Sequence, residues 1–218
     1  CCILFLPKET MHCLRKDYRQ TIGDVLIRRT HVKVSVQSFY IGKYEVTQEE
    51  WYSIMGNNPS EYTGDKRPVE QVGFKECEEF ISRLNTITGR NFRLPTEEEW
   101  EYAARGGKFT RQYEFAGSNN SNSVAWHGEN SGSGYGHTHI VGKKNPNELG
   151  LYDMSGNVGE LTQGVYISTV NGSCHIYRGG SYLVGPHHCT VYDRDFTSDQ
   201  SSSKGISWNG LRLVMDVR

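Results

Sequence analysis

Residues 92–107 read FRLPTEEEWEYAARGG, and this stretch marks where one helix begins and ends. Thr96 and Glu99 have the spacing of a capping box, in which a hydroxyl and a carboxylate each satisfy an unpaired backbone N–H. Trp100 follows on the face expected to point inward, and Gly106 ends the helical pattern. The stretch therefore predicts a short helix that buries an aromatic side chain.

Two further helices are predicted upstream. Thr47 and Glu50 form another capping box, and the helix that they begin ends near Gly56. Residues 72–89 (VGFKECEEFISRLNTITG) place apolar side chains at helical spacing, and Gly89 suits the C-cap. We take this helix and the one before it as the two main helices of the fold.

The rest of the chain favours strands and loops. In residues 31–39 (HVKVSVQSF) valines alternate with polar residues, which is typical of a half-buried strand, and residues 39–47 are expected to pair with it as a hairpin. After residue 107 the helical period disappears, and short strands alternate with loops rich in glycine. We predict an α+β fold, with a poorly defined segment at 1–30 and a single domain over 31–218.

Composition excludes several classes of function. The formal net charge is −1, so no excess of basic residues favours nucleic acid. No apolar run reaches the roughly 18–20 residues of a membrane-spanning helix. The six cysteines are scattered, without the spacing of a zinc site or of a disulfide framework. We expect no nucleic-acid partner and no membrane-spanning segment.

Six motifs, in a fixed order, carry a family resemblance. Besides residues 92–107 they are residues 39–51 (FYIGKYEVTQEEW), 67–80 (RPVEQVGFKECEEF), 147–161 (NELGLYDMSGNVGEL), 177–182 (YRGGSY) and 209–214 (NGLRLV). Together they resemble the formylglycine-generating-enzyme, or sulfatase-modifying-factor, family. The resemblance implies a C-type-lectin-like fold, loop-rich with short strands. Its relatives include copper-dependent oxidases that convert a sulfatase cysteine to formylglycine, and non-catalytic receptors such as the variable proteins diversified by retroelements.

Cysteine usage separates these two kinds of relative. Catalytic members carry two cysteines five residues apart after the GGSY motif, and the pair binds copper(I), a soft ion that prefers sulfur. Here the second position is Cys189, whereas the first is Val184, which cannot ligate a metal. We therefore expect no copper and no catalytic residue. Cys189 would serve catalysis only if the chain were an oxidase.

Departures from the family pattern indicate a binding face. The usual GNVWEW has become GNVGEL, and the loss of two large aromatic side chains is expected to open space. Retroelement diversification changes adenines in the codons of a gene, and the altered residues all belong to the set of amino acids that such changes permit. We predict these ligand-binding residues: Gly159, Leu161, Thr162, Tyr182, Leu183, Val184, Gly185, Pro186, His187, His188, Thr190, Tyr192 and Asp193. The sequence CTVYDR is expected to place its altered side chains on one face of a strand.

A calcium site is expected in the loop that precedes this face. The resemblance points to the side chains of Asp153 and Glu160, with the backbone carbonyls of Gly156 and Val158. Calcium takes about six to eight hard oxygen ligands, and such a loop supplies several of them. The ion would hold a long loop in place.

Three functions are compatible with these observations. The first is a non-catalytic protein that displays a variable binding face to a protein or cell-surface ligand, as retroelement-diversified variable proteins do. The second is a formylglycine-generating oxidase acting on a sulfatase cysteine. The third is an accessory domain of an exported bacterial complex. The resemblance favours a bacterial or phage origin and an exported or surface-displayed protein. The sequence leaves the ligand, the oligomeric state and the compartment open.

Overall fold

Three helices form where their caps predict them. The computed structural model describes residues 3–6, 9–21, 24–168, 172–198 and 208–217. Among these are α1 (Gln48–Met55), α2 (Phe74–Thr88) and α3 (Glu97–Ala104). Both predicted capping boxes are present, and the C-cap glycines Gly56 and Gly89 are left-handed. The expected α+β class is confirmed.

A four-stranded sheet joins the two ends of the described chain. Its order is β1 (Ile3–Leu6), β4 (Phe39–Gly42), β10 (Val214–Asp216) and β5 (Phe92–Arg93). The expected hairpin between residues 31–39 and 39–47 is wrong, because β4 pairs with β1 and β10.

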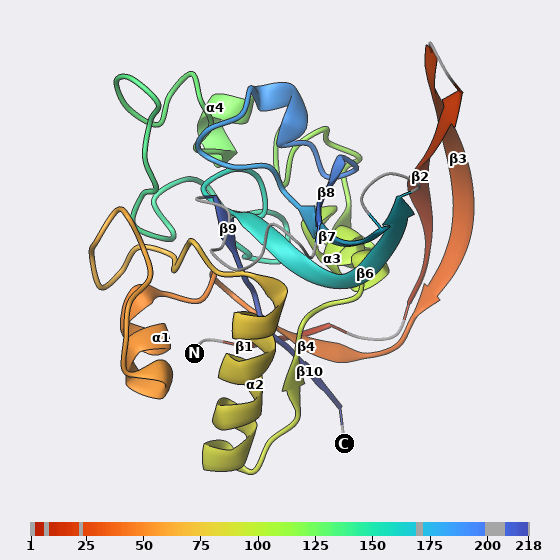
Figure 1. Cartoon of the computed structure of the whole chain (residues 1–218). Helices are drawn as coiled ribbons and strands as arrows, with labels where there is room; N and C mark the ends of the chain where they lie inside the picture. Colours follow the sequence, from red (N-terminus) through yellow and green to blue (C-terminus); the bar gives the residue numbers. More distant parts are fainter. Residues whose placement is uncertain (1–2, 7–8, 22–23, 169–171, 199–207, 218) are drawn as a thin grey trace.

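The strand that ends near residue 36 has its partner upstream. β2 (Glu9–Thr21) and β3 (Asp24–Val36) form a long antiparallel ribbon that curves along one side of the molecule (Figure 1). The segment 1–30, which shows little periodicity in its sequence, therefore contains strands in its described part. The division of the chain at residue 31 stays a prediction.

A second four-stranded sheet contains several of the predicted ligand-binding residues, among them Gly159 and Leu161. Its order is β8 (Arg194–Ser198), β7 (Gly172–Arg178), β6 (Gly159–Ser168) and β9 (Asn209–Gly210). The pairing of β6 with β7 shifts register between Leu161 and Val165, which marks a bulge. The short helices η1 (Gly107–Phe109), α4 (Ser121–Val124) and η2 (Pro186–His188) lie in the long connections.

Helix α3 packs at the centre of the fold. Trp100 is fully buried, and the guanidinium of Arg178 lies over its ring at 5.2 Å. Arg178 is itself buried and pairs with Glu101 at 2.8 Å and Glu97 at 3.3 Å. A buried cation that is paired on α3 holds the end of β7 against the helix.

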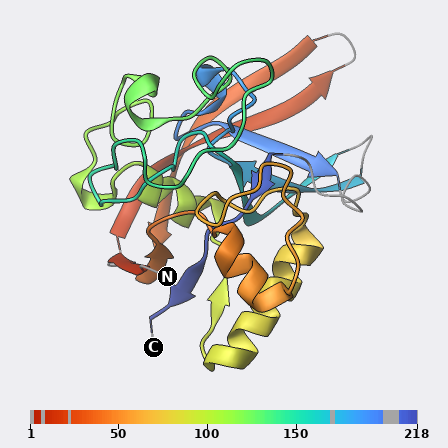
Figure 2. The same cartoon turned by 90° about the vertical axis from the view of Figure 1, so that its left-hand side faces the viewer.

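Two parts of the molecule lie at opposite ends. In both views α2 lies at the lower end, and the turn η2 lies at the upper end next to α4 (Figures 1 and 2). Within the described residues, no helix combines the length and the apolar character needed to cross a membrane.

Candidate binding site

The loop after β7 begins with two glycines that permit a close approach. Gly179 has φ +91° and Gly180 has φ +68°, a region that favours glycine. A Cβ at Gly180 would lie 2.6 Å from the carbonyl oxygen of His188 and 2.8 Å from the Sγ of Cys189. Gly180 therefore allows the turn η2 to fold back onto the end of β7.

The main chain of this loop is held by groups outside it. The N–H of Tyr182 donates to the carbonyl of Asn157 at 2.8 Å, and the hydroxyl of Ser131 donates to the carbonyl of Tyr182 at 2.7 Å. The N–H of Gly128 donates to the carbonyl of Val184 at 2.8 Å. Each of these bonds uses the loop's backbone and none of its side chains.

Asn157 connects these supporting segments to the core. It is fully buried with φ +62°, and its Nδ2 donates to Glu45 Oε2 at 2.7 Å and to the carbonyl of His139 at 3.2 Å. The N–H of His139 donates back to Asn157 Oδ1 at 2.8 Å. This supporting role was not predicted, although the sequence places Asn157 inside the GNVGEL motif.

The side chains of the loop face outward to different degrees. Residues 183–186 are half-buried, whereas His187 and His188 are exposed. The two histidine rings are 4.2 Å apart, and His188 Nδ1 lies 3.1 Å from Asp193 Oδ2. Both histidines lie on a 3-10 turn.

Other predicted ligand-binding residues are buried, which corrects their expected display. These are Gly159, Leu161, Thr162, Tyr182, Thr190 and Asp193. The Thr162 hydroxyl, for example, donates to the carbonyl of Ile176 at 2.9 Å. Tyr192 is half-buried, and its hydroxyl lies 3.2 Å from Glu114 Oε1. Residues 190–193 also form a turn before β8, so CTVYDR does not place its side chains on one face of a strand.

The space that the altered GNVGEL motif was expected to open is filled. A Cβ at Gly159 would lie 2.8 Å from Cδ2 of Tyr177, whose ring is itself buried. Leu161 is fully buried and belongs to the core cluster that contains Val69 and Leu211. The first residues of β6 are therefore part of a packed core.

Cys189 lies beneath the loop in an apolar setting. It belongs to a small cluster with Phe115, Val124 and Ala125, and Val184 packs against that cluster. Burial raises the pKa of the Cys189 thiol to about 12, so the thiol is neutral at physiological pH. Among the described residues no second cysteine belongs to this cluster. A lone neutral thiol beside a valine does not fit copper(I), which needs soft thiolate ligands.

A small polar cleft adjoins the loop. It has a volume of about 10 Å³, roughly the space of one water molecule, and its lining includes Tyr177, Asp195 and Trp208. Trp208 Nε1 donates to the Tyr177 hydroxyl at 3.4 Å, and burial raises the pKa of Asp195. The sequence analysis predicted neither Asp195 nor Trp208, because they lie outside the loop in sequence and only the tertiary structure brings them next to it.

Asp153, the first of the predicted calcium ligands, has one carboxylate oxygen in use. Its Oδ2 accepts the N–H of Gly142 at 2.6 Å, whereas its Oδ1 is buried without a hydrogen-bond partner in the described part of the chain. Burial raises the pKa of Asp153 to about 6. An unsatisfied buried oxygen of this kind suits a hard cation.

Glu160, the second predicted ligand, is fully engaged by other groups. Both of its carboxylate oxygens accept from Arg212 at 2.6–3.0 Å, and Oε2 also accepts from Trp100 Nε1 at 2.6 Å. All three side chains are buried. Asp153 therefore fits a calcium ligand, whereas Glu160 acts as the partner of a buried arginine.

Comparisons with known proteins find the same family that the order of the six sequence motifs indicates. The family described as "Sulfatase-modifying factor enzyme 1-like domain" matches residues 15–217. The "Chaperone protein LppX" of Paenibacillus barcinonensis is 37% identical over 174 residues, covering 58% of this chain and 62% of that protein. The "Formylglycine-generating enzyme" of Mycobacterium tuberculosis is 33% identical over 178 residues, covering 68% and 57%. The chain thus spans about three fifths of the length of these relatives.

Solved structures match nearly the whole chain. "Treponema denticola variable protein 1" superposes with a TM-score of 0.82 and 29% sequence identity, covering 98% of this chain and 94% of that one. The predicted C-type-lectin-like fold of the formylglycine-generating-enzyme type is confirmed by this likeness.

Proposed function

The chain belongs to the sulfatase-modifying factor family, and on that premise we propose that it is a non-catalytic binding protein. Its binding surface is the loop over residues 183–188, next to the turn η2. The likeness to a variable protein supports a loop whose side chains differ between related chains. Its ligand is a protein or another cell-surface molecule.

One observation carries this proposal: the hydrogen bonds that reach the loop from outside are made to main-chain atoms. Asn157 and Ser131 bond to the backbone of Tyr182, directly before the loop, and Gly128 bonds to the carbonyl of Val184. A loop that is pre-ordered in this way loses little conformational entropy when it binds. Side chains at its outward positions are free to change without a change in the backbone.

The side chains of the loop suit recognition. Leu183, Val184 and Pro186 are half-buried and offer apolar contact area, and His187 with His188 adds exposed rings that donate or accept hydrogen bonds. Stiff or ring-bearing side chains lose little entropy on binding, as in antibody loops. The surface therefore combines a firm backbone with mixed polar and apolar contacts.

The oxidase alternative needs chemistry that the site does not support. Copper(I) would require a thiolate pair, and Val184 occupies the position at which the family resemblance expects the first cysteine. Cys189 is buried and neutral, as described above. Among the described residues no second cysteine adjoins Cys189, which favours binding over catalysis.

An array of purified extracellular proteins and glycans tests the proposal. We expect the wild-type chain to bind one class of target, and a triple variant, Leu183→Ala with His187→Ala and His188→Ala, to lose at least tenfold in affinity. Lys108→Ala serves as the control, because Lys108 is exposed and far in sequence from the 183–188 loop. This variant should bind the target as the wild type does. Binding that survives the triple variant would contradict the proposal.

Calcium is a separate proposal. Asp153 would hold the ion through its unpartnered Oδ1, together with the carbonyls of Gly156 and Val158, and the ion would stabilise the loop that contains Asn157. At a calcium concentration of about 100 times Kd, binding adds about 2.7 kcal/mol, which raises Tm by several degrees.

Thermal unfolding with and without calcium checks this proposal. Asp153→Asn should abolish the increase in Tm, and Asp65→Asn, at an exposed carboxylate, should leave it unchanged. An unchanged Tm in the wild type at millimolar calcium would rule the site out. The bacterial or phage origin and the exported or surface-displayed location are proposals that rest on the family resemblance alone.

A further inference from the structure

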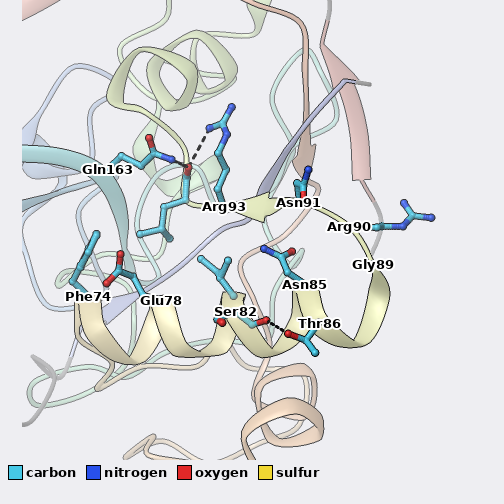
Figure 3. A pocket seen from close by; sticks show the side chains of 12 residues that line it. Phe74, Glu78, Ser82, Asn85, Thr86, Gly89, Arg90, Asn91, Arg93 and Gln163 are labelled. Carbon is cyan, nitrogen blue, oxygen red and sulfur yellow. Dashed lines mark hydrogen bonds between the residues drawn. The ribbon is translucent and has the colours of Figure 1, made fainter.

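A second concave site lies at the opposite end of the molecule from the loop. It is a groove of about 760 Å³ between one face of α2 and the chain that returns from the helix into β5, with Gln163 of β6 at its far end (Figure 3). Volumes of 300–1,000 Å³ are typical of ligand sites. Nothing in the binding proposal uses this groove.

The groove extends along the whole of helix α2. It follows α2 from Phe74 to Gly89, which is the length of the 15-residue helix, or about 22 Å at 1.5 Å per residue. An extended peptide rises about 3.3 Å per residue, so about six or seven residues fit this length. A compact ligand would leave much of the groove empty.

The lining has an apolar floor and a polar rim. Ile81 and Leu94 are buried and form the floor, whereas Ser82, Asn91 and Gln163 are exposed at the edges. The Gln163 amide donates one N–H to the Leu94 carbonyl at 2.9 Å and keeps its oxygen and a second N–H for a ligand (Figure 3). The Asn91 amide offers a donor and an acceptor as well, as a peptide backbone requires. An extended chain placed here would turn every second side chain toward the floor.

Strand addition is blocked at this edge of the first sheet. β5 is the edge strand, but the Asn85 side chain accepts from the Phe92 N–H at 2.7 Å and donates to the Phe92 carbonyl at 2.9 Å. The backbone of Phe92 is therefore not available for pairing with another strand. A peptide in this groove must be recognised through side chains.

Sugar binding is less well supported by the lining. Phe74 is the aromatic side chain of the groove, and its ring is stacked on His175 with centroids 3.6 Å apart and an interplanar angle of 7°. One face of the ring is therefore already covered by a neighbour. A saccharide would lack an open aromatic platform with both faces accessible.

Opposite charges mark the two ends. Glu78 lies toward the N-terminal end of α2, and Arg90 follows its C-terminal end, and both are exposed. The third charged residue, Arg93, already pairs with Glu99 at 2.7 Å and with Asp216 at 2.6 Å. A peptide with a basic group at one end and an acidic group at the other would complement this arrangement.

We propose that the groove binds an extended peptide segment of a partner protein. An apolar side chain of the peptide lies over Ile81 and Leu94, an acidic group meets Arg90, and a basic group meets Glu78. Because this groove and the 183–188 loop are at opposite ends (Figures 1 and 2), both are able to bind at the same time. The second site holds whether or not the proposed loop function does.

Selection from a phage library of random dodecapeptides, with the purified chain as bait, tests this inference. Enriched peptides are then made synthetically, and their Kd is measured by fluorescence anisotropy. Ser82→Arg places a long side chain in the groove and should weaken binding at least tenfold. Ile87→Arg adds the same charge to an exposed position of α2 outside the groove, and should change Kd less than twofold.

Charge reversal sharpens the test. Arg90→Glu should raise the Kd of peptides that carry an acidic residue at least fivefold. Arg83→Glu, on α2 but outside the groove, should leave their Kd unchanged. The triple variant of the 183–188 loop should bind these peptides as the wild type does. Failure to enrich any peptide, equal binding by Ser82→Arg, or loss of binding in the loop variant would each overturn the inference. Glycan binding that Ser82→Arg abolishes would overturn the peptide assignment.

Discussion

The first residues of β6 and the loop over residues 183–188 depart from the family pattern in the same way, yet the fold uses them differently. Leu161 and Thr162 have no measurable exposure. His187 and His188 are exposed, and the backbone around them is held from outside. An altered residue in a sequence motif therefore marks either a repacked core or a displayed surface.

The difference lies in what each side chain contacts. At Gly159 the ring of Tyr177 occupies the space that a side chain at this position would take. In the loop the hydrogen bonds from outside are made to backbone groups, so changes at the exposed His187 and His188 need no compensation inside the fold. Core positions are constrained by volume, and loop positions are constrained by the main chain.

The largest effect is expected where Leu161 is truncated. Leu161→Ala removes a fully buried side chain from the core and should lower the free energy of unfolding by about 3 kcal/mol. Leu183→Ala, at a half-buried position in the loop, should cost less than about 1 kcal/mol, since surface changes are usually small. Urea denaturation measures both. Equal losses would remove the distinction between the two regions.

Two glycines give a closer comparison. A Cβ at Gly159 and a Cβ at Gly185 would each meet a ring atom at 2.8 Å, from Tyr177 and His187 respectively. Tyr177 is buried and cannot move, so Gly159→Ala should cost about 1–3 kcal/mol. His187 is exposed and can rotate away, so Gly185→Ala should cost less than about 0.5 kcal/mol. The account fails here if Gly185→Ala is the more damaging change.

The smallest effect is expected at the histidines themselves. The double variant His187→Ala with His188→Ala removes two exposed rings and, with them, one contact between His188 Nδ1 and the buried carboxylate of Asp193. We expect a change in the free energy of unfolding below about 0.5 kcal/mol. A crystal structure of this variant should show the same backbone over 181–189. A rearranged loop would mean that its side chains hold it after all.

Local signals in the sequence predicted the helices well. The capping boxes at Thr47 and Thr96 and the glycine at 89 fix helix ends through neighbouring atoms, so no knowledge of the rest of the fold is needed. The order of motifs predicted the fold class through the family resemblance. The position of Val184 next to the cluster of Cys189 follows from the same resemblance.

Long-range contacts could not be read from the sequence. The pairing of β4 with β1 and β10 brings together residues from both ends of the chain, and no local pattern encodes that choice. Burial of Gly159 and Leu161 depends on Tyr177 and on the core of the first half of the chain. The groove along α2 likewise needs Gln163, which is far from the helix in sequence.

Titration with copper(I) against a competing chelator tests the central claim most directly. The wild-type chain and Val184→Ser should bind no stoichiometric copper(I), because each has a single thiol at the site. Val184→Cys adds a second thiol in a side chain similar in size to the serine of the control. This variant should bind one copper(I) ion per chain. One tightly bound copper(I) per wild-type chain, lost in Cys189→Ser, would contradict the account and identify the protein as a candidate oxidase.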